Sequence, residues 1–575
     1  MHEHGISVIR AILPLITCST LIVVLGVLVQ AGVIGSTPIS LLELLGVSAV
    51  LLVATLTFLG CNAFGLTEPL IVGSVVGLIL GIPHVALPLS ALLELVYLGI
   101  VPIGGATAPN AVVAIIVALL FAKILGYTTL GVAELGTLMA IAIPVGVLTM
   151  YLETVSAGSW INVYSRWADK EIERGNTRKL GVIALLGSLQ WFAIYMIPVL
   201  VIAALSMSSA ILETLKAMLE SPGLQRILLA LGVGAILLPA AGLGLLLKLT
   251  YNPDTLPWFI LGYVLVAYLK LPVLGVGLLV VSLTLVVHWR DLQEALQALS
   301  AVSSALQRGS SQVLTRSDLI KTYLKILFAG QWAWNYERMQ GTAYAFIMNH
   351  VEKKLRKDRE ELKSWMSLHN EFFNTHPLMT AMIVGVNIAV EENGADQETV
   401  RSLKASLMGP LAGLGDSLVW YTWRPITFGI GSGLALVAGA VGPLMSFILW
   451  SPLVMLLGWY LLKLGYGCGL DVVSLIKGGR IEVIRRVAST VVIAMVATLG
   501  ASCIAVSTPV RIAVPGSEPV DVQAVIDTVA PRLIPLVFLL GSFYMYRRGL
   551  SILKVLAVYF LVGAVLGFMG VLSVG

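Results

Sequence analysis

Repeated apolar runs, each long enough to cross a bilayer, constrain this chain more than any other feature of its sequence. A membrane-spanning helix needs about 20 consecutive, mostly apolar residues. Such runs recur along the chain, at Leu41–Gly60, Leu180–Leu205, Ile227–Leu247, Trp258–Val287, Val487–Val506 and Ser551–Leu572. Inside a bilayer the backbone N–H and C=O groups need partners within the protein, and a helix supplies them. The sequence therefore predicts an all-α, polytopic membrane protein.

The composition supports this class and excludes several functions. Only 12% of the 575 residues are charged, against about 25% in an ordinary soluble domain. The net charge of +5 is spread over the segments between apolar runs, so it bears on topology and does not predict nucleic-acid binding. The four cysteines have no CxxC spacing, and we interpret them as packed apolar residues. The sequence predicts no cofactor, no metal site and no catalytic residue in this chain.

A polar stretch from His288 to about Trp365 divides the chain into two apolar halves. It opens with WRDLQEALQALSAVSSALQRG, where apolar residues recur at steps of three and four, as in an amphipathic helix. It ends with VEKKLRKDREELKSW, whose excess of basic residues favours the cytoplasmic side. We therefore predict an amphipathic cytoplasmic linker at 288–313, with an ordinary solvated linker as the alternative. A second amphipathic helix, at the membrane surface, is predicted from the apolar residues Leu319, Tyr323, Ile326 and Leu327.

A short motif occurs once in each half. Residues 67–70 read TEPL and residues 375–378 read THPL. An apolar stretch follows each motif, and then a Gly/Pro-rich segment that ends at Asn110 in the first half and at Asp416 in the second. The match is either chance or the trace of a repeated unit. Transporters are often built from such repeats, whose broken helices meet at a central site.

Polar residues close to apolar runs predict a cavity. A charge at bilayer depth is expensive and usually functional, and non-helical backbone there needs protein or a water-filled cavity to satisfy it. We therefore interpret GGATAPN, ending at Asn110, and GPLAGLGD, ending at Asp416, as re-entrant hairpins that line a cavity. Exposed peptide groups, a carboxamide and a carboxylate suit a sugar, because its ring offers many hydroxyl groups.

Several of these side chains also have structural explanations. Trp420 would stack on the apolar face of a sugar, or it belongs to an interfacial belt of aromatic residues. Asp416 would contact the sugar, form a salt bridge with Arg424, or do both. Glu68 would cap the following helix. Glu94 lies among Leu and Val, where a free charge is costly, so it needs a partner or a cavity.

Longer segments identify a family resemblance. GQWAWNYERMQGTAYAF, HNEFFNTHP, SLMGPLAGLGDSLVWYTWRPI and APRLIPLVFLLGSFYMYRRGL resemble, in this order, the IID membrane subunit of mannose-family (mannose/fructose/sorbose) sugar phosphotransferase systems. EPLIVGSVVGLILG and LLELVYLGIVPIGGATAPNA resemble the IIC subunit of the same family. The chain is similar to a IIC–IID fusion. Its expected parts are a IIC-like domain at 1–287 with an additional N-terminal span at about Val8–Val33, the linker, and a IID-like domain at 314–575.

The resemblance implies an architecture and a mechanism. In this family IIC and IID are similar folds in inverted orientation, with re-entrant hairpins, and an elevator-like movement carries a hexose or amino sugar inward across the cytoplasmic membrane. The permease assembles as a homotrimer in the lipid bilayer. A cytoplasmic IIB protein, charged through IIA, phosphorylates the sugar. The phospho-accepting histidines belong to IIA and IIB, so no histidine of this chain is expected to carry a phosphoryl group.

The residue patterns and the resemblance together predict the site. The predicted substrate-binding residues are Glu68, Glu94, Asn110, Glu337, Gln340, Asn374, Asp416 and Trp420. The predicted structural or gating residues are Gly104, Gly105, Pro109, His376, Gly415 and Arg424. His376 precedes a proline and is expected to orient a neighbour. We expect these residues of the two halves to meet around one polar cavity.

Two departures from the family pattern keep other functions open. By the resemblance, Glu68 stands where many relatives have Gln, and Asn110 stands where Asp is common; we expect both changes to bear on which sugar is accepted. One alternative is an uncoupled sugar carrier or channel of the same fold. Another is an ion-coupled transporter in which Glu68, Glu94 and Asp416 carry protons; its uptake would collapse with an uncoupler. The sequence does not identify the sugar.

Overall fold

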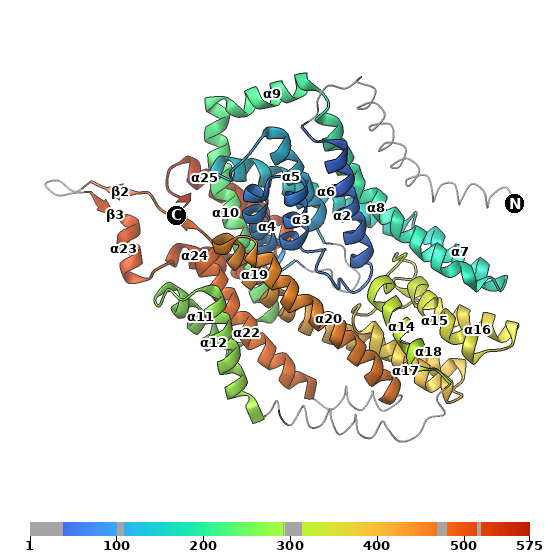
Figure 1. The fold of residues 1–575 in the computed structure, drawn as a ribbon. Helices are drawn as coiled ribbons and strands as arrows, with labels where there is room; N and C mark the ends of the chain where they lie inside the picture. The colour runs from blue at the N-terminus through green and yellow to red at the C-terminus, as the bar shows by residue number, and fades with distance from the viewer. Residues whose placement is uncertain are drawn as a thin grey trace.

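The chain is almost entirely helical in the parts that the structure describes (Figure 1). The computed structural model describes residues 38–100, 108–290, 293, 313–468, 480–513 and 519–574. The predicted N-terminal span, Gly104, Gly105 and most of the predicted linker lie outside the described residues. The expectation of a mostly helical chain with several apolar helices is confirmed.

The first half forms helices that are connected by short turns. Its helices are α2 (Leu41–Phe58), α3 (Pro69–Ile79), α4 (Pro83–Tyr97), α5 (Ala111–Leu125), α6 (Val132–Gly158), α7 (Asn162–Glu173), α8 (Leu180–Leu205), α9 (Ser209–Glu220), α10 (Pro222–Thr250), α11 (Leu256–Ala267) and α12 (Val273–Val287). The 3-10 turns η1 (Thr177–Lys179) and η2 (Pro253–Thr255) precede α8 and α11. Helix starts follow local chemistry: Ser40 and Glu43 form a capping box at α2.

The second half continues the helical pattern and adds two short antiparallel ladders. Its helices are α14 (Arg316–Ala329), α15 (Gly341–Leu355), α16 (Arg359–His369), α17 (Thr380–Glu392), α18 (Gln397–Gly415), the π-helical segment η3 (Asp416–Trp423), α19 (Arg424–Ala438), α20 (Val441–Cys468), α22 (Arg480–Cys503), α23 (Val522–Val529), α24 (Leu533–Arg547) and α25 (Ile552–Phe568). The ladders pair β1 (Val506–Ser507) with β4 (Ser573–Val574) and β2 (Arg511–Ile512) with β3 (Val520–Asp521).

Several helices are long enough to cross a membrane. Among the described residues five helical stretches are long and apolar enough, or six if α23 and α24 count as one bent span. Helix α8 has the bounds of the predicted run Leu180–Leu205. The predicted single span Trp258–Val287 is wrong, because the chain turns between α11 and α12, with Lys270 at φ +55°. A lysine and Pro272 at the turn end the first helix although the hydropathy stays high.

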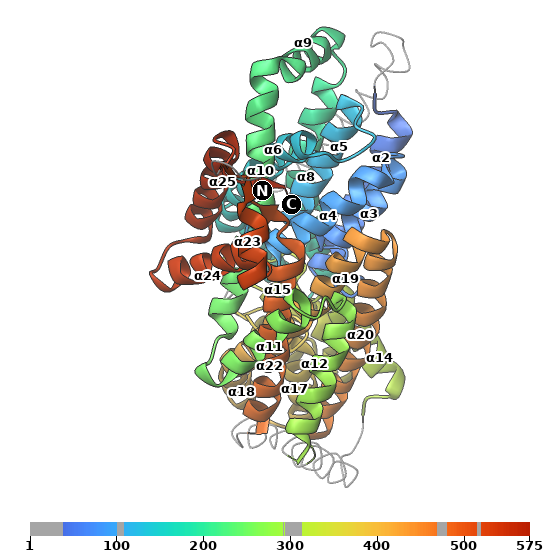
Figure 2. The same cartoon turned by 90° about the vertical axis from the view of Figure 1, so that its left-hand side faces the viewer.

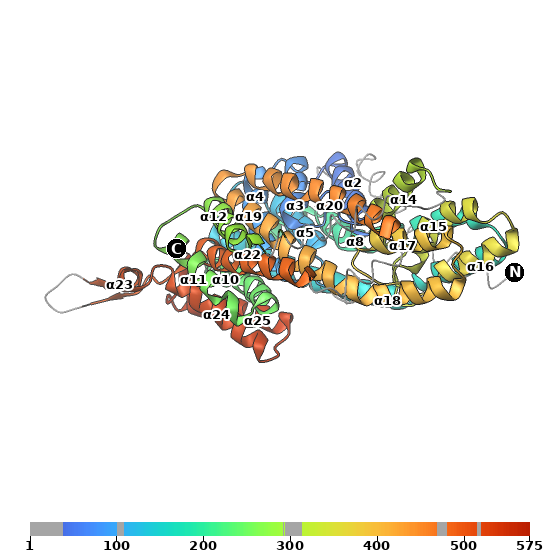
Figure 3. The ribbon, with the colours of Figure 1, turned by 90° about the horizontal axis from the view of Figure 1, so that it is seen from below.

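The predicted amphipathic helix of the second half is α14. Thr315 and Asp318 form a capping box at its start. The predicted apolar face is buried, and it consists of Leu319, Tyr323, Ile326 and Leu327. The face packs against other protein helices, including α2, α15, α17 and α20. Helices α14–α18 gather with α7 at one end of the molecule, and α23 projects at the other end (Figures 1 and 3).

The two halves interlock through their last helices. Helix α10 of the first half packs against α24 and α25, whereas α11 and α12 pack against α22 (Figures 1 and 2). Each of the two large apolar cores therefore contains side chains of both halves: Tyr559 of α25 belongs to the first core, and Phe259 of α11 to the second. The sequence boundary near residue 313 is not a boundary between separately packed units.

Glycines allow this close approach. A Cβ at Gly234 of α10 would collide with the carbonyl oxygen of Phe560, and a Cβ at Gly262 of α11 would collide with the carbonyl oxygen of Ala494 in α22. Gly563 of α25 faces Gly234 from the other side. Small residues at helix crossings bring backbones together, and packing then replaces lipid contact.

A methyl group at this crossing should separate α10 from α25. We expect Gly234→Ala to lower the free energy of unfolding by about 1–3 kcal/mol, the usual cost of overpacking. The matched control is Gly223→Ala in the same helix, because a Cβ there meets nothing within 4 Å. Thermal unfolding of the purified proteins in detergent compares the two. Equal midpoints for Gly234→Ala and the wild type would contradict the tight crossing.

Candidate functional site

A cavity of about 200 Å³ lies where the two halves meet. Its polar lining comes from both halves and includes Asn62, Thr67, Glu68, Asn110, Glu153, Tyr195, Gln331, Gln340, Asn374, Thr375, His376, Asp416 and Arg424. Aromatic rings complete the wall, namely Phe58, Tyr97, Trp191, Trp334 and Trp420. Such a mixture of apolar surface and a few convergent polar groups is typical of a small-molecule site.

The two related motifs face this same cavity. Thr67 and Glu68 line it from the first half, and Thr375 and His376 line it from the second. Glu68 occupies the N-cap position of α3, but its side chain makes no cap hydrogen bond. The cap explanation for Glu68 is therefore wrong, because its carboxylate is engaged elsewhere.

A buried ion pair joins the two halves at the cavity wall. Arg424 of α19 donates from two guanidinium nitrogens to Oε2 of Glu68, at 2.7 and 2.8 Å. A third nitrogen donates to the carbonyl oxygen of Leu98 at 3.1 Å. The predicted alternative, an Asp416–Arg424 salt bridge, is wrong, since Arg424 binds Glu68 and Asp416 makes no ion pair within the described residues.

Glu94 supports this ion pair and does not line the cavity. It is fully buried, and its Oε2 accepts the backbone N–H of Leu70 at 3.1 Å, which satisfies a free amide at the start of α3. Its Oε1 lies 3.8 Å from Arg424. The structure thus gives Glu94 the partner that its apolar surroundings required, but it does not place this carboxylate at the predicted sugar site.

Asp416 reaches the cavity from a continuous helical segment. The predicted re-entrant hairpin at GPLAGLGD is wrong: α18 runs through Pro410 to Gly415, and the π-helical segment η3 and then α19 follow without a break. Proline and glycine lower helix propensity, but tertiary packing overrides it here. π-helical turns often occur at functional sites. Gly415 is required for close approach, because a Cβ there would collide with the His376 ring.

Trp420 and His376 pack against each other at the cavity. Their ring centroids lie 5.3 Å apart, and Trp450 lies 6.3 Å from Trp420 on a nearly parallel plane. The Nδ1 atom of His376 accepts the backbone N–H of Leu378 at 3.2 Å, which holds the ring in a neutral tautomer. The backbone that follows Pro377 thus holds the His376 ring in place, and the orienting role of His376 stays a prediction.

Asn110 has a partner that the sequence reasoning missed. Its Oδ1 accepts the backbone N–H of Val113 at 2.9 Å and caps α5, while its Nδ2 donates to Oε1 of Glu153 at 2.6 Å. Glu153 lies in α6 and lines the cavity with Asn110. A lone acid within a membrane-spanning run is itself a signal of function, and it would have identified Glu153. Pro109 also lines the cavity.

The IID-like motifs divide between the cavity and a neighbouring interface. Gln340 is buried and donates to the carbonyl oxygen of Thr375 at 2.7 Å, next to Asn374, which also lines the cavity. Glu337 does not line it: its carboxylate pairs with Arg166 at 3.1 Å near the surface. The structure therefore does not support the predicted substrate contact of Glu337.

Removing Arg424 should leave carboxylates uncompensated in the interior. We expect Arg424→Gln to destabilise the fold by about 3–5 kcal/mol, as for other broken buried pairs, and Glu68→Gln added to it should recover part of the loss. The control is Arg166→Gln, because an exposed pair contributes about 0–1 kcal/mol. The unfolding free energies of the purified Arg424→Gln and Arg166→Gln variants are compared with that of the wild type. Equal losses of unfolding free energy in the two variants would show that the buried pair has no special role.

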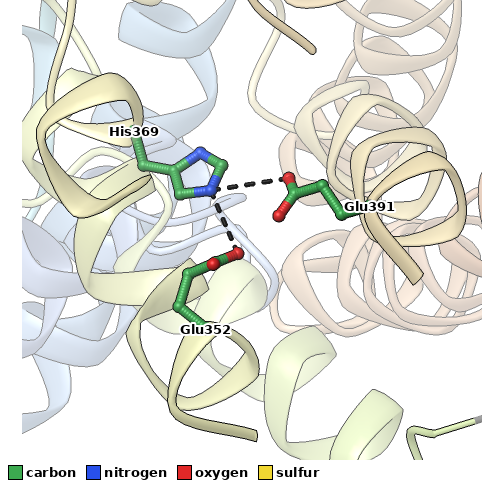
Figure 4. Close-up of side chains that lie close together, drawn as sticks. All are labelled: Glu352, His369 and Glu391. Atoms are coloured by element: carbon green, nitrogen blue, oxygen red, sulfur yellow. Dashed lines mark hydrogen bonds and ion pairs between the residues drawn. The ribbon is translucent and has the colours of Figure 1, made fainter. Parts of the chain in front are cut away.

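A second buried polar cluster lies outside the cavity (Figure 4). The Nε2 atom of His369 lies 3.2 Å from Glu352 and 3.5 Å from Glu391, and all three side chains are buried. These atoms could hold a metal ion by their spacing. However, Arg356 lies 3.5 Å from Glu352 and 3.9 Å from Glu391, so the Arg356 guanidinium already faces both carboxyl groups together with the His369 ring. We interpret the cluster as an ion-pair network between α15, α16 and α17.

This network should make stability depend on pH. Burial lowers the pKa of His369, but the carboxylates of Glu391 and Glu352 outweigh burial and raise the pKa to about 9. The stabilisation that comes from a raised histidine pKa is complete below the unfolded pKa near 6.5. It is lost as the pH rises through the folded pKa of about 9. The wild type should therefore exceed His369→Gln in unfolding free energy most at pH 6, and the difference should shrink by pH 9. A difference independent of pH would contradict a protonated His369.

Comparisons with known proteins match both halves. Residues 313–572 match the model described as "PTS system mannose/fructose/sorbose family IID component", and residues 41–286 match "PTS system sorbose-specific iic component". The chain is 33% identical over 269 residues to the mannose-specific EIID component of Escherichia coli, covering 45% of this chain and 94% of that protein. It is 26% identical over 251 residues to the fructose permease IIC component of Bacillus subtilis, covering 43% and 86%. A solved structure described as "Structure of membrane protein" is 30% identical, with a TM-score of 0.43, and covers 45% of this chain and 99% of that chain.

Proposed function

We propose a sugar-binding role for the cavity of this chain, which belongs to the mannose/fructose/sorbose family of phosphotransferase-system (PTS) components. The chain joins a IIC part to a IID part, and the sugar binds in the cavity between the two parts. The chain is a membrane component of PTS sugar transport. One observation carries the location of the site: polar side chains of both parts line a single cavity. A sugar ring offers hydroxyl groups in all directions, so a site enclosed from both sides suits it.

The lining residues supply complementary contacts to a sugar. Asp416 and Asn374 offer a carboxylate and a carboxamide for hydroxyl groups, and the ring of Trp420 offers an apolar face. Gln340 and Arg424 are bound to other protein groups and hold the wall in place. Glu94 acts through Arg424 and the start of α3 and is not proposed to touch the sugar.

Family membership supports phosphorylation of the transported sugar. The sugar that leaves the cavity on the cytoplasmic side receives a phosphoryl group from a separate IIB protein, which IIA supplies. No histidine of this chain carries that group. We further propose the cytoplasmic membrane as the location, a homotrimer as the assembly, inverted IIC and IID halves, and an elevator-like movement as the translocation step. The interlocked halves agree with a single transport unit. Family membership does not favour an uncoupled carrier.

Reconstitution tests the coupled mechanism. The purified chain is placed in vesicles with IIA and IIB proteins and a phosphoryl donor, and a panel of labelled hexoses and amino sugars is offered outside. We expect sugar phosphate to accumulate inside only when the donor is present. Uptake of free sugar without donor would support the uncoupled carrier, and uptake abolished by an uncoupler would support ion coupling.

Asp416→Asn should weaken sugar binding without unfolding the protein. A hydrogen bond to a charged group contributes about 1.5–3 kcal/mol, against about 1 kcal/mol for a neutral one, so the affinity should fall on the order of tenfold. Trp420→Ala should weaken binding separately through lost ring contact. The control is Asp254→Asn at the exposed turn η2. Equilibrium binding to the purified protein measures the effect, and an unchanged affinity would assign Asp416 a structural role.

A further inference from the structure

We infer that the cavity selects a sugar that carries a protonated amine, and that Glu153 pairs with this ammonium group. The inference rests on the proposed function, since it names the substrate class of the same site. The contacts among the described residues show which charges of the cavity wall already have a partner.

The described lining has more acids than bases. Glu68, Glu153 and Asp416 contribute carboxylates, whereas Arg424 contributes a permanent cation. Arg424 is bound to Glu68 through two guanidinium nitrogens, so it is already neutralised. His376 accepts a backbone N–H through Nδ1 and adds no charge. Two carboxylates therefore face the cavity without a cation from the described part of the chain.

Glu153 is the more deeply buried of these two. Only 6% of its surface is exposed, and within the described residues it forms no ion pair. Its partner at 2.6 Å is the Asn110 carboxamide, whose orientation is fixed because the opposite atom caps α5. The Tyr195 hydroxyl is the other neighbour. Neutral donors orient a carboxylate but do not cancel its charge, so Glu153 in this cavity either takes up a proton or pairs with a cation that the ligand brings.

Aromatic rings that line the same cavity as Glu153 favour an ammonium group over other cations. Trp191, Tyr195 and Trp334 line the same cavity. The ring of Trp191 lies 6.2 Å from Tyr195 and 6.1 Å from Trp334, centroid to centroid. Aromatic faces attract ammonium groups through their quadrupoles, and most strongly where the cation is desolvated. A carboxylate that shares a cavity with aromatic rings therefore suits the amine of a sugar, whereas beside a neutral hexose the buried Glu153 would have to take up a proton.

Series of three ring-matched sugars test the charge. Equilibrium binding to the full-length purified chain is measured for glucosamine, glucose and N-acetylglucosamine, and for the corresponding galactose and mannose series. The amine is replaced by a hydroxyl group in one partner and is made neutral by acetylation in the other. We expect at least one amine to bind ten times more tightly than both of its neutral partners. Its affinity should fall as the pH rises and the amine loses its proton, while the neutral sugars change little.

The residue is tested by a variant of the same size. Glu153→Gln should lower the amine affinity at least tenfold and change the affinity of neutral sugars less than twofold. Glu134→Gln is the matched control, because Glu134 lies on α6 outside the cavity lining. If Glu153→Gln does not fold, the pH dependence of amine affinity in the wild type still tests whether the cavity selects the protonated amine.

The outcomes separate this inference from the proposed function. Neutral sugars that bind as tightly as the amines, with binding weakened by Asp416→Asn, would overturn the amine selectivity and leave the proposed site intact. An amine preference that survives Glu153→Gln would overturn the role of Glu153. If no sugar of the panel binds, both proposals fail.

Discussion

The ion pair between Glu68 and Arg424 is the interaction on which the site depends. It joins a residue at the start of α3 to a residue at the start of α19, so it fixes the two halves to each other at the cavity wall. Taking two charges out of water is expensive unless their geometry and hydrogen bonds are good. Here the carbonyl oxygen of Leu98 and the carboxyl group of Glu94, both from the first half, also lie next to the Arg424 guanidinium.

The helical content was predictable because hydropathy is a local property. Helix α8 has the predicted bounds, and the buried face of α14 follows from its spacing. The break between α11 and α12 was missed, since the residues on both sides are apolar and only Lys270 and Pro272 indicate a turn. The helical course through Pro410 depends on packing against other elements, which no local pattern contains.

The candidate site was predictable only in part. Asn110, Asn374 and Asp416 were singled out from local oddities, and the structure places them around one cavity. Glu94 and Glu337 have protein partners away from it. Glu153 was overlooked although it is an acid within an apolar run, and its contact with Asn110, 43 positions away, could not be read from local sequence. Sequence identifies costly residues, whereas tertiary contacts decide which of them already have their charge compensated.

The exchange of last helices between the halves has a consequence for biosynthesis. When the first half leaves the ribosome, the side of α10 that will contact α25 has no protein neighbour, and α11 and α12 still lack α22. Neither core is complete until the C-terminal helices are inserted. Because both halves belong to one polypeptide, they are produced in equal numbers and meet at the high effective concentration of tethered partners. Joining the halves in one chain thus turns a search between two membrane proteins into the last step of a single folding reaction.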